Sequence, residues 1–279
     1  MQQEIHFVTG KGGVGKSLVA AGLAYREAQK GRRVLLVELS EKSFYQIAFG
    51  LPSVTYTPTL LEGSLYVAMF ESESCLREYA LHLLKSEALY RLFFQNAVSR
   101  ALIDVAPGLK ELTILGKITS GPRNHGPPAP FDVLVVDAYS TGHFLALMRA
   151  PGALAQAVKF GPMGEQSRSI DRTIRDLEIC RYHIVCLAED LPVQESVELH
   201  QTLVSEFCIQ PQIWLNKTVS NFTEDNCTGE FARWLAGMKQ KESKAIQRLK
   251  DANMQVRLVP LFLTSTGMDL MSMISRALA

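Results

Sequence analysis

The chain has 279 residues, of which 47% are hydrophobic and 20% are charged, a composition typical of a globular protein with enough apolar side chains for a core. Lys and Arg total 29 against 28 for Asp and Glu, so the net charge of +1 gives no indication of nucleic acid as a partner. No apolar run reaches the roughly 18 residues that span a bilayer. The N-terminus carries no basic-then-apolar signal segment, so we expect a cytoplasmic protein without an integral membrane segment.

The first predicted elements are a short apolar strand, Ile5 to Val8, a glycine-rich loop and a helix, Leu18 to Lys30. The loop matches the phosphate-binding pattern G-x-x-x-x-G-K-[ST] in Gly10-Lys11-Gly12-Gly13-Val14-Gly15-Lys16-Ser17. Glycines let the backbone wrap around phosphate oxygens, and the N–H groups at a helix N-terminus form an anion site. We therefore expect Lys16 to reach the β- and γ-phosphates of a nucleotide and the Ser17 hydroxyl to bind Mg²⁺.

The next part of the chain predicts two strands followed by a helical region. Arg33 to Leu39 is an apolar run that ends near an acid, as in a parallel strand covered on both faces, and Leu65 to Phe70 is a second strand. In residues 74–118 apolar side chains recur at helical spacing, and we interpret this region as a helical insert within a single domain of 1–279. Gly121 to Pro130 contains four prolines and predicts an exposed, irregular connection.

The second half of the chain alternates strands with helices. Strands are predicted at 131–137, 182–188, 212–215 and 255–259, and helices at 165–179, 193–207, 230–252 and 267–278. This alternation predicts an α/β fold with a doubly wound, mainly parallel sheet of roughly seven or eight strands and helices on both faces.

Asp137 ends the apolar strand of 131–137, which places its carboxylate at the edge of the sheet where ligands bind in open α/β folds. We expect Asp137 to hold Mg²⁺ directly or through water. The chain continues as Ala138-Tyr139-Ser140-Thr141-Gly142-His143. Gly142 is expected to offer a backbone N–H near a γ-phosphate, and His143 either senses phosphate or simply begins a helix.

Two of these motifs resemble those of known ATPases. The early Lys11 in the glycine-rich loop resembles the deviant phosphate-binding loop of the SIMIBI class, which includes MinD, ParA, the nitrogenase iron protein and ArsA. The segment that begins at Asp137 resembles the D-T-A-P-T-G-H segment of ArsA and the tail-anchored-protein-targeting ATPases, with Tyr139-Ser140 in place of Ala-Pro. The resemblance implies a homodimer through the nucleotide face, in which Lys11 reaches the partner's nucleotide. The alternative is that Lys11 is a solvated loop charge.

A third segment, from Cys186 to Ser196, resembles the family's C-I-A-E-x-L-S-x-x-E-T. By the same resemblance Asn216 pairs with adenine and the residues Pro260, Leu261 and Phe262 form a wall around the base. The alternative for Asn216 is a turn cap after a strand. Guanine-binding proteins have an Asn-Lys-x-Asp pattern. Here Asn216-Lys217-Thr218 is followed by Val219 in place of the aspartate, so ATP is favoured over GTP.

The segment after the second strand departs from the family, which has D-P-A-H there. Aligning Ala48-Phe49-Gly50 with the family's A-F-G places Ser40 where an aspartate orients the attacking water. A serine is no general base without an activating neighbour, so either Glu41 or Glu38 substitutes or hydrolysis is slow. We take Lys11, Lys16, Glu41 and Asp137 as the candidate catalytic residues.

In the targeting ATPases, helices of the insert form a groove for a client's transmembrane segment. Pro107-Gly108-Leu109-Lys110-Glu111 resembles the family's P-G-x-x-E turn. The stretch 150–180, which follows the segment that begins at Asp137, is short. Leu89 to Phe94 either lines such a groove or packs on the sheet or a partner subunit. The five cysteines lack C-x-x-C spacing, so we expect reduced thiols and no metal besides Mg²⁺.

The sequence therefore predicts a dimerising Mg·ATP-binding ATPase switch that hydrolyses ATP slowly and takes a hydrophobic client. Two alternatives stay open: a ParA/MinD-like positioning ATPase, and a nucleotide-dependent interaction protein that no longer hydrolyses ATP. The C-terminal stretch from Asp269 to Ala279 carries Arg276 as its single basic residue, which disfavours a MinD-type membrane helix.

Overall fold

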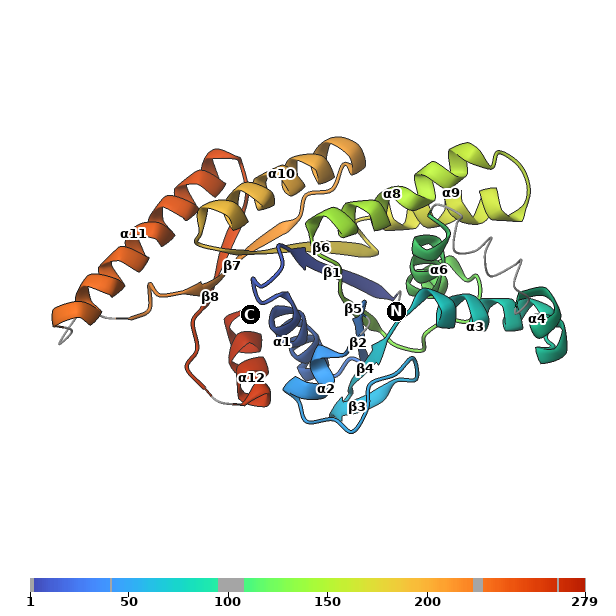
Figure 1. Cartoon of the computed structure of the whole chain (residues 1–279), viewed down its shortest axis with the longest axis horizontal. Helices are drawn as coiled ribbons and strands as arrows, with labels where there is room; N and C mark the ends of the chain where they lie inside the picture. Colours follow the sequence, from blue (N-terminus) through green and yellow to red (C-terminus); the bar gives the residue numbers. More distant parts are fainter. Residues whose placement is uncertain (1–2, 41, 95–107, 223–227, 265, 279) are drawn as a thin grey trace.

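The computed structural model describes residues 3–40, 42–94, 108–222, 228–264 and 266–278 (Figure 1). Its centre is an eight-stranded sheet with the order β3-β4-β2-β5-β1-β6-β7-β8, parallel except between β3 and β4. The strands are β1 (Glu4–Gly10), β2 (Val34–Glu38), β3 (Thr59–Glu62), β4 (Leu65–Met69), β5 (Val133–Asp137), β6 (Cys180–Leu187), β7 (Gln212–Thr218) and β8 (Val256–Pro260). The predicted α/β class and mainly parallel sheet are confirmed.

Helices cover both faces of the sheet, so its apolar strands are buried on each side (Figure 1). The helices are α1 (Lys16–Gln29), α2 (Phe44–Ala48), α3 (Ser72–Leu84), α4 (Glu87–Phe94), α6 (Leu109–Ile118), α7 (Ser120–Arg123), α8 (Thr141–Ala157), α9 (Pro162–Arg175), α10 (Asp190–Phe207), α11 (Gly229–Asp251) and α12 (Gly267–Ala277). One core lies between the sheet and α1 with α12, and the other between the sheet and α6, α8, α9 and α10. Among the helices of the described residues, none is both long enough and apolar enough to cross a bilayer.

Helices α3, α4, α6, α8 and α9 form one group, which we call the helical side of the molecule, and this group is larger than the predicted insert of 74–118. Helices α3, α4 and α6 lie within residues 74–118 or begin just before them, but α8 and α9 also pack against α6 (Figure 1). The sequence predicts α8 only in the alternative in which His143 begins a helix, and it does not predict that the helix continues through an internal Pro151. Of the predicted client-binding residues, the side chains of Leu89, Leu92, Phe93 and Phe94 lie outside the described part of the structure.

The prediction that Gly121 to Pro130 is irregular throughout is wrong, because Ser120–Arg123 forms the short helix α7. Pro122 is tolerated there, since the first turn of a helix leaves its N–H groups without intrahelical partners. Ala129 is also buried, at 7% exposed, so the connection is partly packed into the protein.

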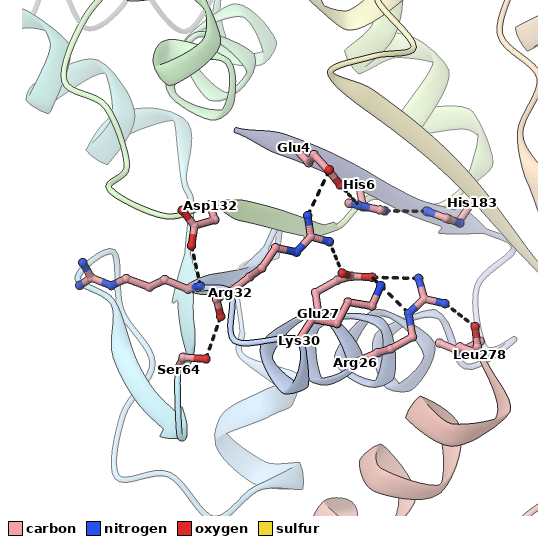
Figure 2. A network of polar contacts seen from close by, with 11 residues as sticks. Glu4, His6, Arg26, Glu27, Lys30, Arg32, Ser64, Asp132, His183 and Leu278 are labelled. Carbon is pink, nitrogen blue, oxygen red and sulfur yellow. Dashed lines mark hydrogen bonds and ion pairs between the residues drawn. The ribbon is translucent and has the colours of Figure 1, made fainter. Parts of the chain in front are cut away.

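His6 on β1 and His183 on β6 are the two histidines of a buried polar chain (Figure 2), which continues to Trp214 on β7. Trp214 Nε1 donates to His183 Nδ1 over 3.1 Å, and His183 Nε2 lies 3.0 Å from His6 Nδ1. Because His183 Nδ1 accepts, a neutral His183 must donate its Nε2 proton to His6. The remaining His6 nitrogen faces Glu4 at 3.5 Å. Burial lowers the pKa of both histidines, so both are neutral in the folded protein at pH 7.

The same region contains a buried carboxylate with several cationic partners (Figure 2). Glu27 is 1% exposed and pairs with Arg26, Lys30 and Arg32. Burial alone would raise the pKa of Glu27, but the hydrogen bonds from Arg32, Lys30 and Arg26 lower it to about 2. Arg26 also donates to the carbonyl of Leu278, so this network joins the end of α1 to the end of α12.

We expect the free energy of unfolding to decrease as the pH falls below about 6.5, because unfolded histidines bind protons that buried His6 and His183 reject. The decrease between pH 7 and pH 5 is at most about 2 kcal/mol for each imidazole, and urea titrations at the two pH values measure it. His183→Gln should reduce this pH dependence, because it removes one of the two buried imidazoles. An identical pH dependence in His183→Gln and the wild type would contradict the assignment.

Candidate nucleotide-binding site

The glycine-rich loop lies between β1 and α1, at the carboxyl edge of the parallel strands. Gly13 and Gly15 have φ of +85° and +91°, a left-handed conformation that glycine adopts without strain, and Gly15 precedes the first turn of α1. Lys16 Nζ donates to the carbonyl of Lys11 over 3.2 Å, so the lysine reaches across the loop. Burial lowers the pKa of Lys16, although the charge of Asp137 opposes this effect. The loop and Lys16 together form a site suited to a polyphosphate.

Asp137 lies beside the start of α1, as the sequence predicts. In the sheet it is in register with Val8 on one side and Glu38 on the other. Burial raises the pKa of Asp137 to about 6, while hydrogen bonds from Ser17 and Tyr45 and the charge of Lys16 act in the opposite direction. A buried carboxylate next to a serine hydroxyl offers the hard oxygen ligands that Mg²⁺ prefers, so Ser17 and Asp137 fit the predicted metal.

Tyr45 is a member of this site that the sequence did not indicate. Its side chain is fully buried, and its hydroxyl lies 3.0 Å from Asp137 Oδ2 and 3.0 Å from the carbonyl of Ser17. A phenol has one proton, so it donates to one of these oxygens at a time. No motif surrounds Tyr45; the nearest indication is the N-cap Ser43, which begins α2 and turns Tyr45 toward the loop.

Glu38, the last residue of β2, stabilises the start of α2. Its two oxygens accept hydrogen bonds of 2.6 Å from the Ser43 hydroxyl and from the backbone N–H of Phe44, so the carboxylate holds the start of α2. Ser40 donates its hydroxyl to the carbonyl of Lys42 over 2.8 Å. The predicted catalytic residue Glu41 lies outside the described residues. Glu38 is therefore unsuited to orient water, and the prediction for Glu41 stays open.

Lys11 contacts an acid of its own chain. Its ammonium forms an ion pair with Glu195 on α10, and the second oxygen of Glu195 accepts a hydrogen bond of 3.3 Å from Thr141 at the start of α8. Both charged side chains are about one-third exposed, so solvent screens part of the attraction. Glu195 was not among the predicted site residues, although it lies in the segment that carried the third resemblance. The carboxylate thus links the phosphate loop to the segment that follows Asp137.

Asn216 lies in β7, two residues before the strand ends at Thr218, directly beside the phosphate loop. Its Nδ2 donates to the carbonyl of Val14 over 2.8 Å, and its Oδ1 accepts from the N–H of Lys217 over 2.9 Å. A Cβ at Gly15 would lie 2.5 Å from Asn216 Nδ2, so glycine permits this close approach. Asn216 is thus part of its strand and not a turn cap after it, and its contact with adenine stays a prediction.

The remaining predicted residues lie around the same edge of the sheet. Pro260 ends β8, and the N–H of Leu261 donates to the carbonyl of Thr218 over 2.8 Å. Phe262 packs against the apolar cluster that includes Val14. Gly142 is exposed in the first turn of α8, and the space around it is open. The predicted site residues that the structure describes thus come from β1, β5, β7 and β8, from α1 and α8, and from the loops beside these elements.

Comparisons with known proteins agree with this geometry. The family model described as "Anion-transporting ATPase" matches residues 3–166. ATPase BagA of Mycobacterium tuberculosis is 30% identical over 71% of this chain and 60% of that protein. The ATPase ASNA1 homolog of Plasmodium vivax is 25% identical over 86% of this chain and 70% of that protein. The arsenical pump-driving ATPase of Acidiphilium multivorum is 24% identical over 87% of this chain and 43% of that protein.

The chain spans about 60% of the length of the mycobacterial relatives that it matches. The residues matched by the family model include the phosphate loop, Asp137 and Gly142, which are the groups that the structure gathers at one edge of the sheet. The chain therefore belongs to the ArsA-type anion-transporting ATPase family.

Proposed function

We propose that this protein binds Mg·ATP at residues 10–17, hydrolyses it slowly and acts as a nucleotide-dependent switch in the cytoplasm. The observation that carries the proposal is the convergence of Lys16, Ser17 and Asp137, with a buried Tyr45 hydroxyl fixing the position of the Asp137 carboxylate. Backbone amides and Lys16 would hold the phosphates, while Ser17 and Asp137 would hold Mg²⁺, which neutralises phosphate charge when bound. Asn216, with Pro260, Leu261 and Phe262, would contact the adenine.

Calorimetry with Mg·ATP, together with phosphate-release assays, tests this proposal. We expect Lys16→Ala to weaken ATP binding by about 10- to 100-fold, because a charge-assisted hydrogen bond to phosphate is lost. Lys159→Ala is the matched control, since Lys159 is exposed and lies between α8 and α9. Absence of any heat of binding with the folded wild-type protein would overturn the proposal.

We expect slow hydrolysis because Ser40 stands where the family has an aspartate that orients the attacking water. Loss of a water-orienting carboxylate costs ~10²–10⁴ in rate, and Glu38 is engaged in holding α2. We expect Ser40→Asp to accelerate phosphate release by about tenfold or more, whereas Ser40→Asn, of similar size but uncharged, should not. Equal rates in the two variants would show that Ser40 does not occupy the position of the family's aspartate.

Tyr45→Phe tests the bond between Tyr45 and Asp137. The phenol donates to the carboxylate and so stabilises its charged form, and removing it should raise the pKa of Asp137 further above 6. The midpoint of Mg²⁺-dependent ATP binding between pH 5 and pH 8 should move upward by about 0.5–1 pH unit. Tyr25→Phe on α1, whose hydroxyl lies near Glu62 and not near Asp137, is the control, and an unmoved midpoint in Tyr45→Phe would contradict this account.

We further propose that ATP drives homodimerisation, with Lys11 exchanging Glu195 for the partner's nucleotide. Light scattering with ADP, ATP and a slowly hydrolysed analogue measures this step. We expect Lys11→Ala to abolish ATP-dependent dimerisation while retaining ATP binding, and Glu195→Gln to favour the dimer because it releases Lys11. Dimerisation that Lys11→Ala leaves intact would contradict the proposed role of Lys11.

The outcome of these assays also separates the alternatives. ATP-dependent dimers without phosphate release would favour the hydrolysis-deficient interaction protein, an idea that Ser40 motivates. Binding to lipid vesicles would favour a ParA/MinD-like positioning role. Capture of an apolar peptide by the ATP-bound protein would favour a hydrophobic client at the helical side.

A further inference from the structure

A cavity of about 310 Å³ lies on the helical side of the protein, away from the nucleotide site. Its walls come from α3, α6 and α9 and from the residues that follow α7, and they are predominantly apolar. The apolar lining includes Leu76, Ala80, Leu112, Pro127, Met163 and Ile170. Leu83 and Met163 line the cavity and yet are 58% and 46% exposed, so the space opens to solvent beside them. A space of this size and character is typical of a small-molecule site.

One charged group on the cavity wall, Arg123, has no acidic partner among the residues that the structure describes. The guanidinium of Arg123 donates to Thr119 Oγ1 over 2.8 Å, to Gln166 Oε1 over 2.7 Å and to the carbonyl of Gly116 over 2.9 Å. All three acceptors are uncharged, and a guanidinium carries five N–H donors in total. Burial lowers the pKa of Arg123 to about 10, because desolvation disfavours the charged form and no carboxylate compensates.

The other two charged residues that line the cavity, Glu78 and Lys117, pair with each other. Glu78, the acid on the cavity wall, accepts from Lys117 at 2.6 Å and from the hydroxyl of Tyr56 at 2.6 Å. Among the described residues no carboxylate forms an ion pair with Arg123, whereas Arg175 pairs with Asp171 on α9. A buried cation with neutral partners is costly unless an anion joins it.

We propose that this cavity binds a small amphipathic carboxylic acid, whose carboxylate pairs with Arg123 and whose hydrocarbon body fills the space between α3, α6 and α9. The cavity complements such a ligand because the cation lies in a wall that is predominantly apolar. A transmembrane helix is about 30 Å long and 10–12 Å wide, so it exceeds this cavity many times over. The occupant is therefore a small molecule.

Calorimetry with straight-chain carboxylates of six to twelve carbons, each compared with the primary alcohol of the same length, tests the proposal. The carboxylate should bind about tenfold or more tightly than its alcohol, because only the anion forms charge-assisted hydrogen bonds with Arg123. Ala80→Phe should abolish binding of both by filling the cavity, since Ala80 is buried in its wall.

Three arginine variants test the role of Arg123. Arg123→Gln should remove the preference for carboxylate over alcohol, and the exposed Arg172→Gln on α9 should retain it. Unchanged ATP affinity and urea unfolding show that each variant is folded. If Arg123→Gln is destabilised, Arg123→Lys replaces it in the test: this variant keeps the positive charge and should restore part of the preference for carboxylate over alcohol. Equal affinity for acid and alcohol in the wild type, or binding that survives Ala80→Phe, would overturn the proposal.

Discussion

The close contact between Gly10 and the carbonyl of Val185 determines where the phosphate loop begins. A Cβ at residue 10 would lie 2.2 Å from that oxygen, so β1 and β6 can approach one another there only through glycine. The loop that follows lies at the carboxyl edge of the sheet, between β5 and β6, where the chains of parallel strands separate to form a binding crevice. Every proposed contact with a nucleotide depends on this placement.

Polar side chains from distant elements then hold the loop in place. Asn216 binds the carbonyl of Val14, Glu195 pairs with Lys11, and Tyr45 bridges Ser17 and Asp137. Several of these groups are the ones that a nucleotide and Mg²⁺ would use under the proposed function. Binding would then replace contacts within the chain by contacts with the ligand, which is how a local event could alter α2, α8 and α10 together.

Buried charges in this protein fall into two groups with different consequences. Glu27 has cationic partners on α1 and in the turn after it, so its charge stabilises the junction of α1 and α12. Arg123 has neutral partners, although it is largely withdrawn from water. A buried charge that is fully paired within the chain, such as Glu27, stabilises the fold. A buried cation with neutral partners on an apolar wall, such as Arg123, is available to bind an anionic ligand.

The sequence by itself determined the phosphate loop, the strand ending in Asp137 and the α/β class, because local patterns of glycine, polarity and apolar spacing specify them. It offered the start of α8 only as one of two interpretations of His143, and it did not predict how far the helix extends, since Pro151 lies inside it. Only the tertiary structure decided that Tyr45 lies on Asp137 and that Glu195 holds Lys11. These residues are far apart in the chain, and their contact depends on how whole layers pack, which spacing along the sequence does not encode.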